Sequence, residues 1–460
     1  MTAAITEAVT ADIDRYVRDA ARAWGLPGQA LALVEAAARD TANRIGLAMI
    51  QLTLQAGGEP VDAQRCVCTE GHRARQTGTR PRTVRTALGP ASYTRTWWHC
   101  DSCHTGWAPA DRWWGITPAG HTAGYDKILA LAGVDHPYRA SAALIGALCG
   151  IDLASPASIA RTTRHVGAAA RATLDTETAL IKTGTLVPLV TGPVPEVGYL
   201  LIDGTGAPMV PHETEGRRGK GPDGRSHTRE VKIGCLFTQA KTTPGGQPVR
   251  DPDSASYLAT FDDASGFAAQ LKTEHARRGF DRIRQPIVIG DGAKWIWGIA
   301  ERLFPEATHI VDYWHAREHV HDLVKIFDHL LADPEAFTHQ LIDHLDHGNI
   351  AGIIDQVNTL HLERYKGKLA ERAGKALDYF TGNTHRMQYH HYRANGWFIG
   401  SGPVEAACKT IVAARAKQAG MRWTITGLDP VLTLRTLTRS GRHQLIWHNN
   451  ASQTPPTQAA

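Results

Sequence analysis

Residues 287–315 read IVIGDGAKWIWGIAERLFPEATHIVDYWH, and this stretch decides the fold that we expect. The apolar run 287–289 predicts a short buried parallel strand that ends at Asp291. Apolar residues at helical spacing follow up to a proline, and a second short apolar run ends on Asp312. Strand, helix and strand form a βαβ unit, and the chemistry of open α/β sheets lies at the carboxyl ends of the strands. Asp291 and Asp312 therefore stand where a site is expected.

Asp291 also has a purely structural interpretation. An Asp that precedes a helix often caps its first turn, which contributes about 1 kcal/mol to stability. The sequence around Asp291 does not distinguish a helix cap from a functional site, so the distinction depends on motifs elsewhere in the chain.

The composition is that of a globular protein. Its 460 residues suffice for roughly two to four domains. The 50 Lys and Arg residues barely exceed the 45 Asp and Glu residues, so net charge alone does not indicate a nucleic-acid partner. No apolar run reaches the length of about 18 residues that spans a membrane, and the polar N-terminus is unlike a signal peptide. We therefore expect a cytoplasmic protein without a membrane partner.

Four of the seven cysteines lie in one segment that is rich in Arg and Trp: Cys66, Cys68, Cys100 and Cys103. An odd cysteine count in a long chain favours metal ligands and buried thiols over disulfides. Two cysteine pairs around a hairpin pattern have the plan of a zinc ribbon, because four thiolates must converge on one ion. The C-x-C pair is tighter than usual, and His72 is an alternative ligand. A metal-free hairpin with ordinary thiols is the other interpretation.

Residues 124–185 predict two helices joined by a short turn. Ser155 and Pro156 suit the N-cap and the first position of the second helix, which carries Arg161 and Arg164. Helix, glycine-containing turn and basic helix form the outline of a helix-turn-helix, which reads DNA. Any helical hairpin shares this outline, so a plain helical hairpin remains an alternative.

The sequence GYLLIDGTGAPMV predicts another strand that ends on an acid, Asp203. The glycine-rich loop EGRRGKGPDGR follows and contains Arg218 and Lys220. It is not a P-loop, because its lysine precedes a glycine instead of Ser or Thr, and we expect a mobile basic loop beside the acid. Further elements that would complete one mixed sheet with its helix are predicted over residues 230–238, 257–261 and 265–278.

Residues 316–392 show an almost unbroken helical pattern with many histidines, which predicts a helical insertion between sheet elements. The sequence GSGPVEAACK then opens a helix with Glu405 in its first turn, where favourable interaction with the helix dipole is the structural alternative. Lys409 lies four residues on and would share the face of Glu405. The basic residues that follow include Arg415, Lys417 and Arg422.

Three acids on separate elements resemble the Asp-Asp-Glu constellation of transposases and integrases with a ribonuclease H-like fold. Five stretches are closer still: LIDGTGAPMV, RRGKGPDGRSHTREVKIG, VIGDGAKWIW, VDYWHARE and IGSGPVEAACKTIVAARAKQAGMRW. Together they resemble the transposases of bacterial insertion sequences of the ISKra group. The resemblance spans residues 198–447, and the cysteine hairpin upstream of them also fits.

The resemblance implies a DDE transposase that cuts the ends of its element and joins them to target DNA. Asp203, Asp291 and Glu405 would be the catalytic acids and would bind two Mg²⁺ or Mn²⁺ ions. Asp312, His315 and Lys409 would support them, and one structural Zn²⁺ would bind the four cysteines of the hairpin. The expected contacts with double-stranded DNA are Arg161, Arg164, Arg218, Lys220, Arg415, Lys417 and Arg422. A homodimer or higher oligomer on DNA, associated with the nucleoid, is expected.

The fold class that follows is α/β, with a ribonuclease H-like mixed sheet. The expected order is an N-terminal helical region (1–58), a zinc-ribbon-like hairpin (59–115), a helix-turn-helix-like region (116–190), the two parts of the core (196–316 and 396–447) around a helical insertion (317–395), and a disordered tail (448–460). Two alternatives remain open: a retired transposase that binds DNA without cutting it, and a ribonuclease H-like nuclease without strand transfer.

Overall fold

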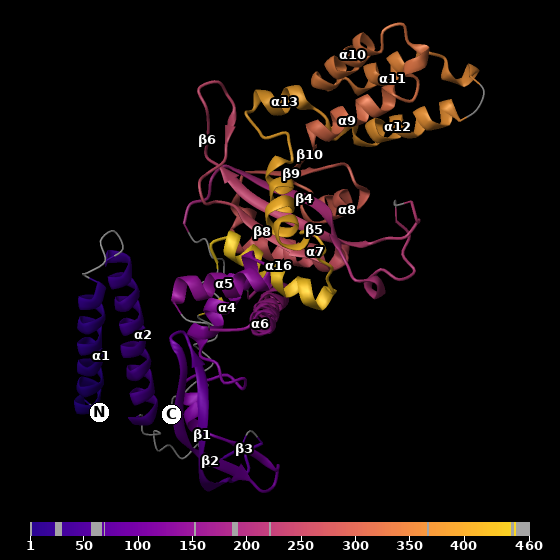
Figure 1. Ribbon diagram of the computed structural model, residues 1–460. Coiled ribbons are helices and arrows are strands. Elements are labelled where there is room, and N and C mark those ends of the chain that lie inside the picture. Colours follow the sequence, from indigo (N-terminus) through magenta and orange to yellow (C-terminus); the bar gives the residue numbers. More distant parts are fainter. Residues whose placement is uncertain are drawn as a thin grey trace. The chain divides into compact units, whose positions relative to one another are not determined.

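A five-stranded mixed sheet forms the centre of the larger part of the protein (Figure 1). Its strands are β4 (Val197–Pro208), β5 (Thr228–Gln239), β8 (Ser256–Thr260), β9 (Gln285–Gly290) and β10 (Thr308–Val311). Their order is β10-β9-β4-β5-β8. β9 runs parallel to β4 and β10, whereas β5 runs antiparallel to β4 and β8. The prediction of an α/β class with a mixed sheet is confirmed.

The computed structural model describes residues 2–23, 30–56, 67–68, 70–150, 153–185, 192–219, 222–365, 368–442 and 446–447. The chain divides into two compact units. We call Met1–Val166 with Gln444–Ala460 the hairpin unit and Gly167–His443 the sheet unit. No helix in the described ranges is long and apolar enough to cross a membrane.

The two central strands of the sheet are buried on both faces, as expected for apolar runs in a parallel pair. The residues 199–202 of β4 and 287–289 of β9 are almost inaccessible to solvent. Pairing between these strands ends with Leu201 opposite Ile289. β4 itself continues to Pro208, paired with β5. The expectation that the strand ends at Asp203 is therefore wrong, and what ends just before Asp203 is the pairing with β9.

Helices pack on the sheet and fix its edges. They are α7 (Ala264–Arg277), α8 (Lys294–Leu303) and α16 (Ile425–Arg439). α8 joins the parallel strands β9 and β10, so the predicted βαβ unit is present. Short elements complete the region around the sheet: η2 (Pro211–Glu213), β6 (Lys241–Thr242), β7 (Pro248–Val249) and η3 (Phe280–Arg282).

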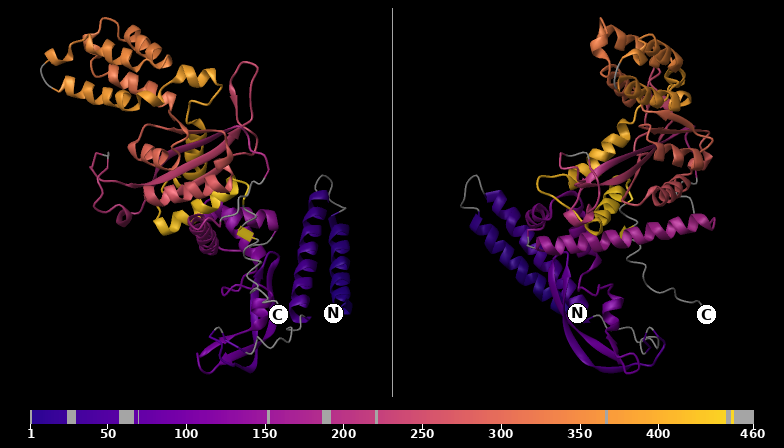
Figure 2. Two further views of the ribbon diagram at one scale, coloured as in Figure 1. Left: turned by 180° about the vertical axis from the view of Figure 1, so that it is seen from behind. Right: turned by 90° about the vertical axis from the view of Figure 1, so that its right-hand side faces the viewer.

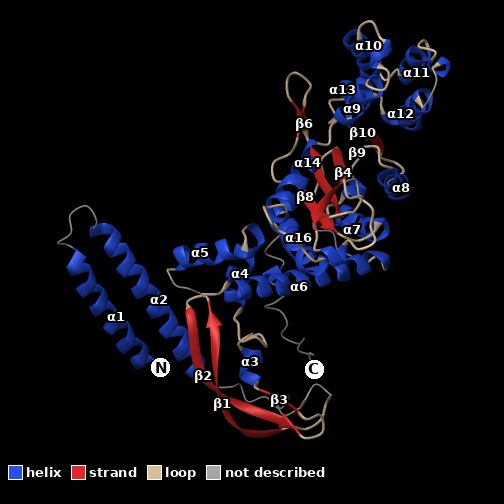
Figure 3. Ribbon diagram, turned by 45° about the vertical axis from the view of Figure 1, so that its right-hand side comes forward, coloured by secondary structure: helices blue, strands red, loops and turns tan. Residues whose placement is uncertain are grey.

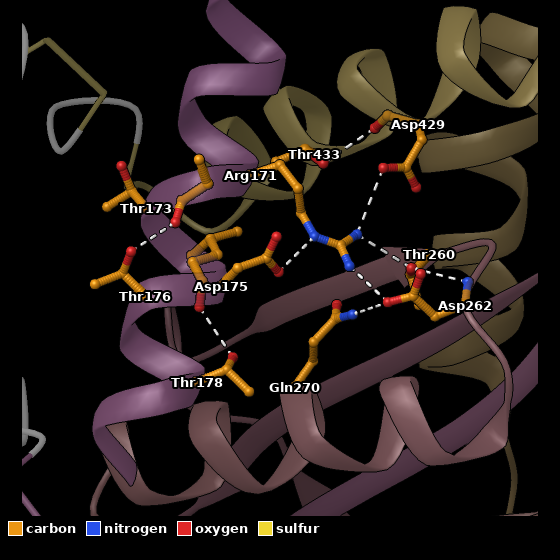
Figure 4. A network of polar contacts seen from close by, with 12 residues as sticks. Arg171, Thr173, Asp175, Thr176, Thr178, Thr260, Asp262, Gln270, Asp429 and Thr433 are labelled. Carbon is orange, nitrogen blue, oxygen red and sulfur yellow. Dashed lines mark hydrogen bonds and ion pairs between the residues drawn. The ribbon is translucent and has the colours of Figure 1, made fainter. Parts of the chain in front are cut away.

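Arg171 joins the long helix α6 (Pro156–Lys182) to the rest of the sheet unit (Figure 4). Its guanidinium donates to Asp175 on the same helix at 2.9 Å and to Asp262, after β8, at 2.5 Å. A longer contact of 3.4 Å reaches Asp429 on α16. One cation thus pairs with three carboxylates from three segments, which fixes the C-terminal half of α6 in this unit.

The segment between β10 and the last helices is helical, as predicted. It contains α9 (Tyr313–Val324), η4 (Asp328–Leu330), α10 (Pro334–Asp346), α11 (Ile350–Asn358), η5 (Leu362–Arg364), α12 (Leu369–Asn383), η6 (Thr384–Arg386) and α13 (Tyr389–Ala394). These helices form a bundle at one end of the sheet unit (Figure 2). Their apolar side chains belong to the same hydrophobic cluster as the sheet, so the insertion and the sheet share one core.

After this bundle the chain returns to the sheet as one nearly continuous helix. It begins as α14 (Gly402–Ala407), changes to a π-helix over Cys408–Ala413, and ends as α15 (Ala414–Ala416). α14 packs on β4 and β5. Because π-helical turns are rare and often mark functional sites, this position beside the sheet is notable.

The hairpin unit combines helices with a three-stranded antiparallel sheet (Figure 3). Its elements are α1 (Thr2–Ala23), α2 (Ala30–Ala56), β1 (Arg75–Thr86), β2 (Gly89–Cys100), β3 (Thr105–Trp107), α3 (Pro109–Trp113), α4 (Ala123–Asp135), α5 (Tyr138–Cys149) and the start of α6. The predicted hairpin is present, with Gly89 at its tight turn. The predicted N-terminal helical stretch forms two helices. Ser155 accepts from the backbone N–H of Ser158 at 3.2 Å, as an N-cap does.

Candidate active site

Asp203 lies on β4, and Asp291 directly follows the neighbouring parallel strand β9, at the same level of the sheet. Each is two residues beyond the Leu201 and Ile289 pair, so both side chains continue the same face. Burial raises the pKa of Asp203, and the negative charge of Asp291 adds to this effect. Two carboxylates thus stand close enough to repel one another in a half-buried setting.

Asp291 begins the turn between β9 and α8. Its Oδ1 accepts from the backbone N–H of Ala293 at 2.9 Å. The residue at the N-cap of α8 is Ala293, which has no side-chain cap, so Asp291 is not the N-cap that the structural alternative supposed. Tyr379 of α12 donates its hydroxyl to the carbonyl of Asp291 at 3.2 Å. Gly292 has φ of +100°, and a Cβ there would lie 2.6 Å from the Tyr379 ring, so this approach requires glycine.

Glu405 lies in the first turn of α14, and the hydroxyl of Ser401 lies between its carboxylate and that of the buried Asp312. Ser401 Oγ lies 2.8 Å from Glu405 Oε1 and also contacts Asp312 Oδ2. Asp312 is fully buried and caps α9 by accepting from the backbone N–H of Trp314 at 2.8 Å. Glu405 and Asp312, which come from different ends of the insertion, are therefore brought together through one hydroxyl.

His315 completes this group. Its Nδ1 lies 3.0 Å from Asp312 Oδ2. This hydrogen bond raises the pKa of His315 to about 9, so the ring is protonated at neutral pH. Burial raises the pKa of Asp312, but hydrogen bonds from His315, Ser401 and Trp314 outweigh it, and the net pKa is lowered. The result is an ion pair between the buried Asp312 and the partly exposed His315, in which Asp312 engages Nδ1 of the ring.

The potential ligand atoms of Asp312, His315 and Glu405 lie within 4.8 Å of one another. The sequence assigned the metal to Asp203, Asp291 and Glu405, with Asp312 and His315 in support. The structure groups Glu405 most closely with the supporting pair. Asp203 and Asp291 form the adjoining part of the site. The positive charge of His315 lowers the pKa of Asp203, and the negative charge of Asp291 raises the pKa of His315.

Cys408 was not expected at the site. It is the first residue of the π-helix, and its thiol donates to Asp203 Oδ2 at 3.2 Å. Burial raises the pKa of this thiol, and the charge of Asp203 raises it further, so the thiol stays protonated. Cys408 lies one helical turn after Glu405, and this spacing is the signal in the sequence that points to it.

The basic residues expected to contact DNA have different environments. Lys409, Arg218 and Arg422 are exposed. Lys417 is exposed and donates to Thr205 Oγ1, two residues beyond Asp203, at 2.8 Å. Arg161 and Arg164 are exposed on α6 in the hairpin unit, and Lys220 lies outside the described residues.

Arg415 does not fit its expected role. Its side chain is fully buried, with the guanidinium 4.9 Å from the centre of the Trp423 ring. A side chain without solvent exposure has no surface to offer a phosphate. We therefore remove Arg415 from the expected contacts with DNA.

A second group of possible metal ligands lies in the hairpin unit and consists of Cys68, His72, Cys100 and Cys103. Cys103 Sγ lies 3.6 Å from Cys68 Sγ and 3.0 Å from His72 Nδ1. Tetrahedral zinc with Zn–S bonds of about 2.3 Å places its sulfurs about 3.8 Å apart, so the spacing of the two thiols fits that ion. The predicted ligand Cys66 lies outside the described residues, and His72, the alternative, takes part in the group.

The acidic site and the cysteine group are the two candidate functional sites of the described residues. No protein-family model matches the chain, and no curated protein has a similar sequence. Conclusions about function accordingly depend on the geometry of the chain's own residues.

Proposed function

We propose that this protein is a DNA transposase that performs metal-dependent phosphoryl transfer with Asp203, Asp291 and Glu405. The strand order supports a ribonuclease H-like core. An antiparallel series β4, β5, β8 is extended on the other side of β4 by the parallel strands β9 and β10. The long helical insertion between β10 and α14 suits the resemblance to transposases whose second Asp and Glu are far apart in sequence.

The single observation that carries the proposal is the meeting of acids from four distant segments at one edge of the sheet. Asp203 and Asp291 lie on adjacent strands, and Glu405 is held to Asp312 by Ser401. Like charges in a half-buried place repel unless cations lie among them. Structural acids are usually paired with Arg or Lys, as Asp429 is with Arg171, whereas among these four acids the ion pair in the described part of the chain is that of Asp312 with His315.

Carboxylate oxygens are the ligands that Mg²⁺ and Mn²⁺ prefer, so the donor set fits these ions. Asp203, Asp291 and Glu405 would hold them. When bound there, such ions would supply the Lewis acidity that phosphoryl transfer between oxygen atoms needs. Cys408 and the backbone N–H of Gly204, which donates to Asp203 Oδ1 at 2.6 Å, hold the Asp203 carboxylate in place.

The protonated ring of His315 has a different role, which is to contact the DNA backbone. Its Nδ1 is occupied by Asp312, so Nε2 is the atom that would donate to a phosphate oxygen of the DNA. Lys409, Lys417, Arg218 and Arg422 would contact phosphates around the acids. In the hairpin unit, one Zn²⁺ on the cysteine group would stabilise the hairpin, and Arg161 and Arg164 would contact DNA.

The test uses DNA that flanks the reading frame as substrate for the full-length protein. Wild type is expected to cut the element end and join it to a second duplex when Mg²⁺ or Mn²⁺ is present. Asp203→Asn, Asp291→Asn and Glu405→Gln keep the shape of each side chain and remove its charge, so each should abolish both steps and preserve DNA binding. Arg372→Met, on the exposed face of α12, serves as the matched control.

The alternatives give different results in the same experiment. Binding without cutting by wild type would identify a retired transposase. Cutting without joined products would identify a nuclease. Full activity in any one of the three acid variants would refute the assignment of the catalytic residues.

A further inference from the structure

Trp314 is an exposed aromatic side chain at the margin of the acidic site. It is 58% exposed. Among the described residues of the sheet unit, the exposed large apolar side chains are Leu180, Trp314 and Tyr365, and Trp314 is the most exposed of the three. Of these three, Trp314 is the one whose backbone N–H donates to the side chain of the buried Asp312, the N-cap of α9. Aromatic side chains are enriched at surfaces that contact other molecules, so an exposed Trp beside the acidic site is a candidate contact.

The ring of Trp314 is held in a defined orientation. Its edge lies against Gly400, where an added Cβ would be 3.2 Å from Trp314 Cδ1 and 3.9 Å from Asp312 Oδ1. The ring of Tyr313 meets it edge to face, with 5.2 Å between centroids. The guanidinium of Arg317 lies 5.6 Å from its centroid. Trp314 therefore presents an aromatic ring whose orientation these contacts define, with the guanidinium of Arg317 over the ring, next to the segment that carries Ser401 and Glu405.

We infer that Trp314 stacks on an unpaired DNA base adjacent to the phosphate that the acids cut. This inference rests on the proposed function. A base inside a duplex has both faces covered by its neighbours, so a protein ring can stack only on a base that has left the helix or lies at its end. Every base offers an aromatic face, and the nearby cation of Arg317 suits the adjoining backbone phosphate. An acidic or uncharged partner surface would explain the aromatic ring but not its place beside a phosphoryl-transfer site.

Stacking on an aromatic side chain changes affinity by about tenfold to a hundredfold for each base. The wild-type protein should therefore prefer DNA with an unpaired base over a continuous duplex by about that factor. The preference should depend on the ring and not on the sequence of the base, because stacking is tolerant of sequence.

The experiment uses two DNA probes with the full-length protein and Ca²⁺ in place of Mg²⁺. One carries 2-aminopurine as an unpaired base at a fork, and the other carries it paired within a duplex. Wild type should bind the forked probe about tenfold more tightly and quench its fluorescence. Trp314→Ala should lose both the preference and the quenching, whereas Trp314→Phe should keep most of the preference.

Trp113→Ala is the matched control, because Trp113 is 59% exposed but lies in the hairpin unit. It should behave as wild type. Retained preference and quenching in Trp314→Ala would overturn the inference while the proposed function stands. A wild-type protein that binds neither probe would overturn both. Loss of self-association in Trp314→Ala, with DNA binding unchanged, would assign the ring to a second copy of the chain and would also overturn the inference.

Discussion

The acidic site and the cysteine group are assembled in different ways. The acids stand on a sheet with an extensive core, and their positions are fixed by hydrogen bonds from Ser401, Tyr379 and Cys408. The cysteine group is itself part of a small cluster whose buried residues are Cys68, Ala74 and Cys100. We therefore expect the first site to keep its shape without an ion and the second to need an ion for its shape. Function and folding are therefore expected to respond oppositely to changes at the two sites.

Removal of zinc should give the largest effect. Structural zinc contributes about 10–16 kcal/mol in small domains, so a chelator should unfold the hairpin of β1, β2 and β3. The sheet unit should remain folded. Hydrogen exchange measured on the two units, with metal analysis of tag-free protein, would check this.

The ligands themselves allow a finer test. Cys100→Ser should release the zinc, and Cys149→Ala, at a cysteine outside the group, should retain it. His72→Ala should also release zinc if the imidazole is a ligand. A folded hairpin in metal-free protein would contradict the comparison.

Asp203→Asn should have the opposite pattern. Loss of the charge should lower cutting and joining about a thousandfold. Stability should be unchanged or higher, because burial and the charge of Asp291 already raise the pKa of Asp203. Thermal melting of the variant, next to its activity, gives the comparison. A large fall in melting temperature would mean that the acid serves the fold.

Arg171→Met tests whether the sheet unit depends on polar contacts far from the site. Asp175, Asp262 and Asp429 would lose the cation that they share. The free energy of unfolding should fall by about 2–3 kcal/mol. This is less than for a fully buried ion pair, because Asp175 and Asp262 are partly exposed to solvent. Arg372→Met should change stability little. Urea unfolding of the two variants would show the difference, and equal midpoints would contradict the structural role of Arg171.

His275 should make the stability of the sheet unit depend on pH. Its ring lies 4.7 Å from that of Phe304, and burial lowers its pKa to about 4. The folded state keeps the ring neutral, whereas in the unfolded state the ring takes up a proton as pH falls below about 6.5. The free energy of unfolding should therefore decrease by up to about 3 kcal/mol by pH 4. His275→Phe should flatten this part of the stability profile, and His329→Phe, at an exposed histidine, should leave it unchanged. Parallel profiles for wild type and His275→Phe would exclude this source of pH dependence.

Tyr379→Phe should give the smallest effect. It removes one hydrogen bond to the carbonyl of Asp291, which contributes about 1 kcal/mol. Activity should fall severalfold with little change in melting temperature. Tyr365→Phe, at an exposed tyrosine, is the control. No change in activity would show that the insertion does not position Asp291.

The sequence predicted elements whose patterns are local. Apolar runs and helical spacing located β9, α8 and β10, and the acids that follow the strands came from the same patterns. It did not predict Ser401 as the bridge to Asp312, because the two are 89 residues apart and their contact depends on the folded insertion. The contact between Cys408 and Asp203 spans 205 residues and was missed for the same reason.

The π-helix over Cys408–Ala413 changes the phase of the helix that carries Glu405. Each extra residue in a turn rotates everything beyond it by about 100° relative to an α-helical projection. A regular helix projection therefore misassigns the faces of the residues after Cys408. Arg415 lies inside and Lys417 reaches Thr205 at the surface. Deleting one residue from this segment would leave the composition almost unchanged, yet we expect it to exchange which basic side chains face the surface.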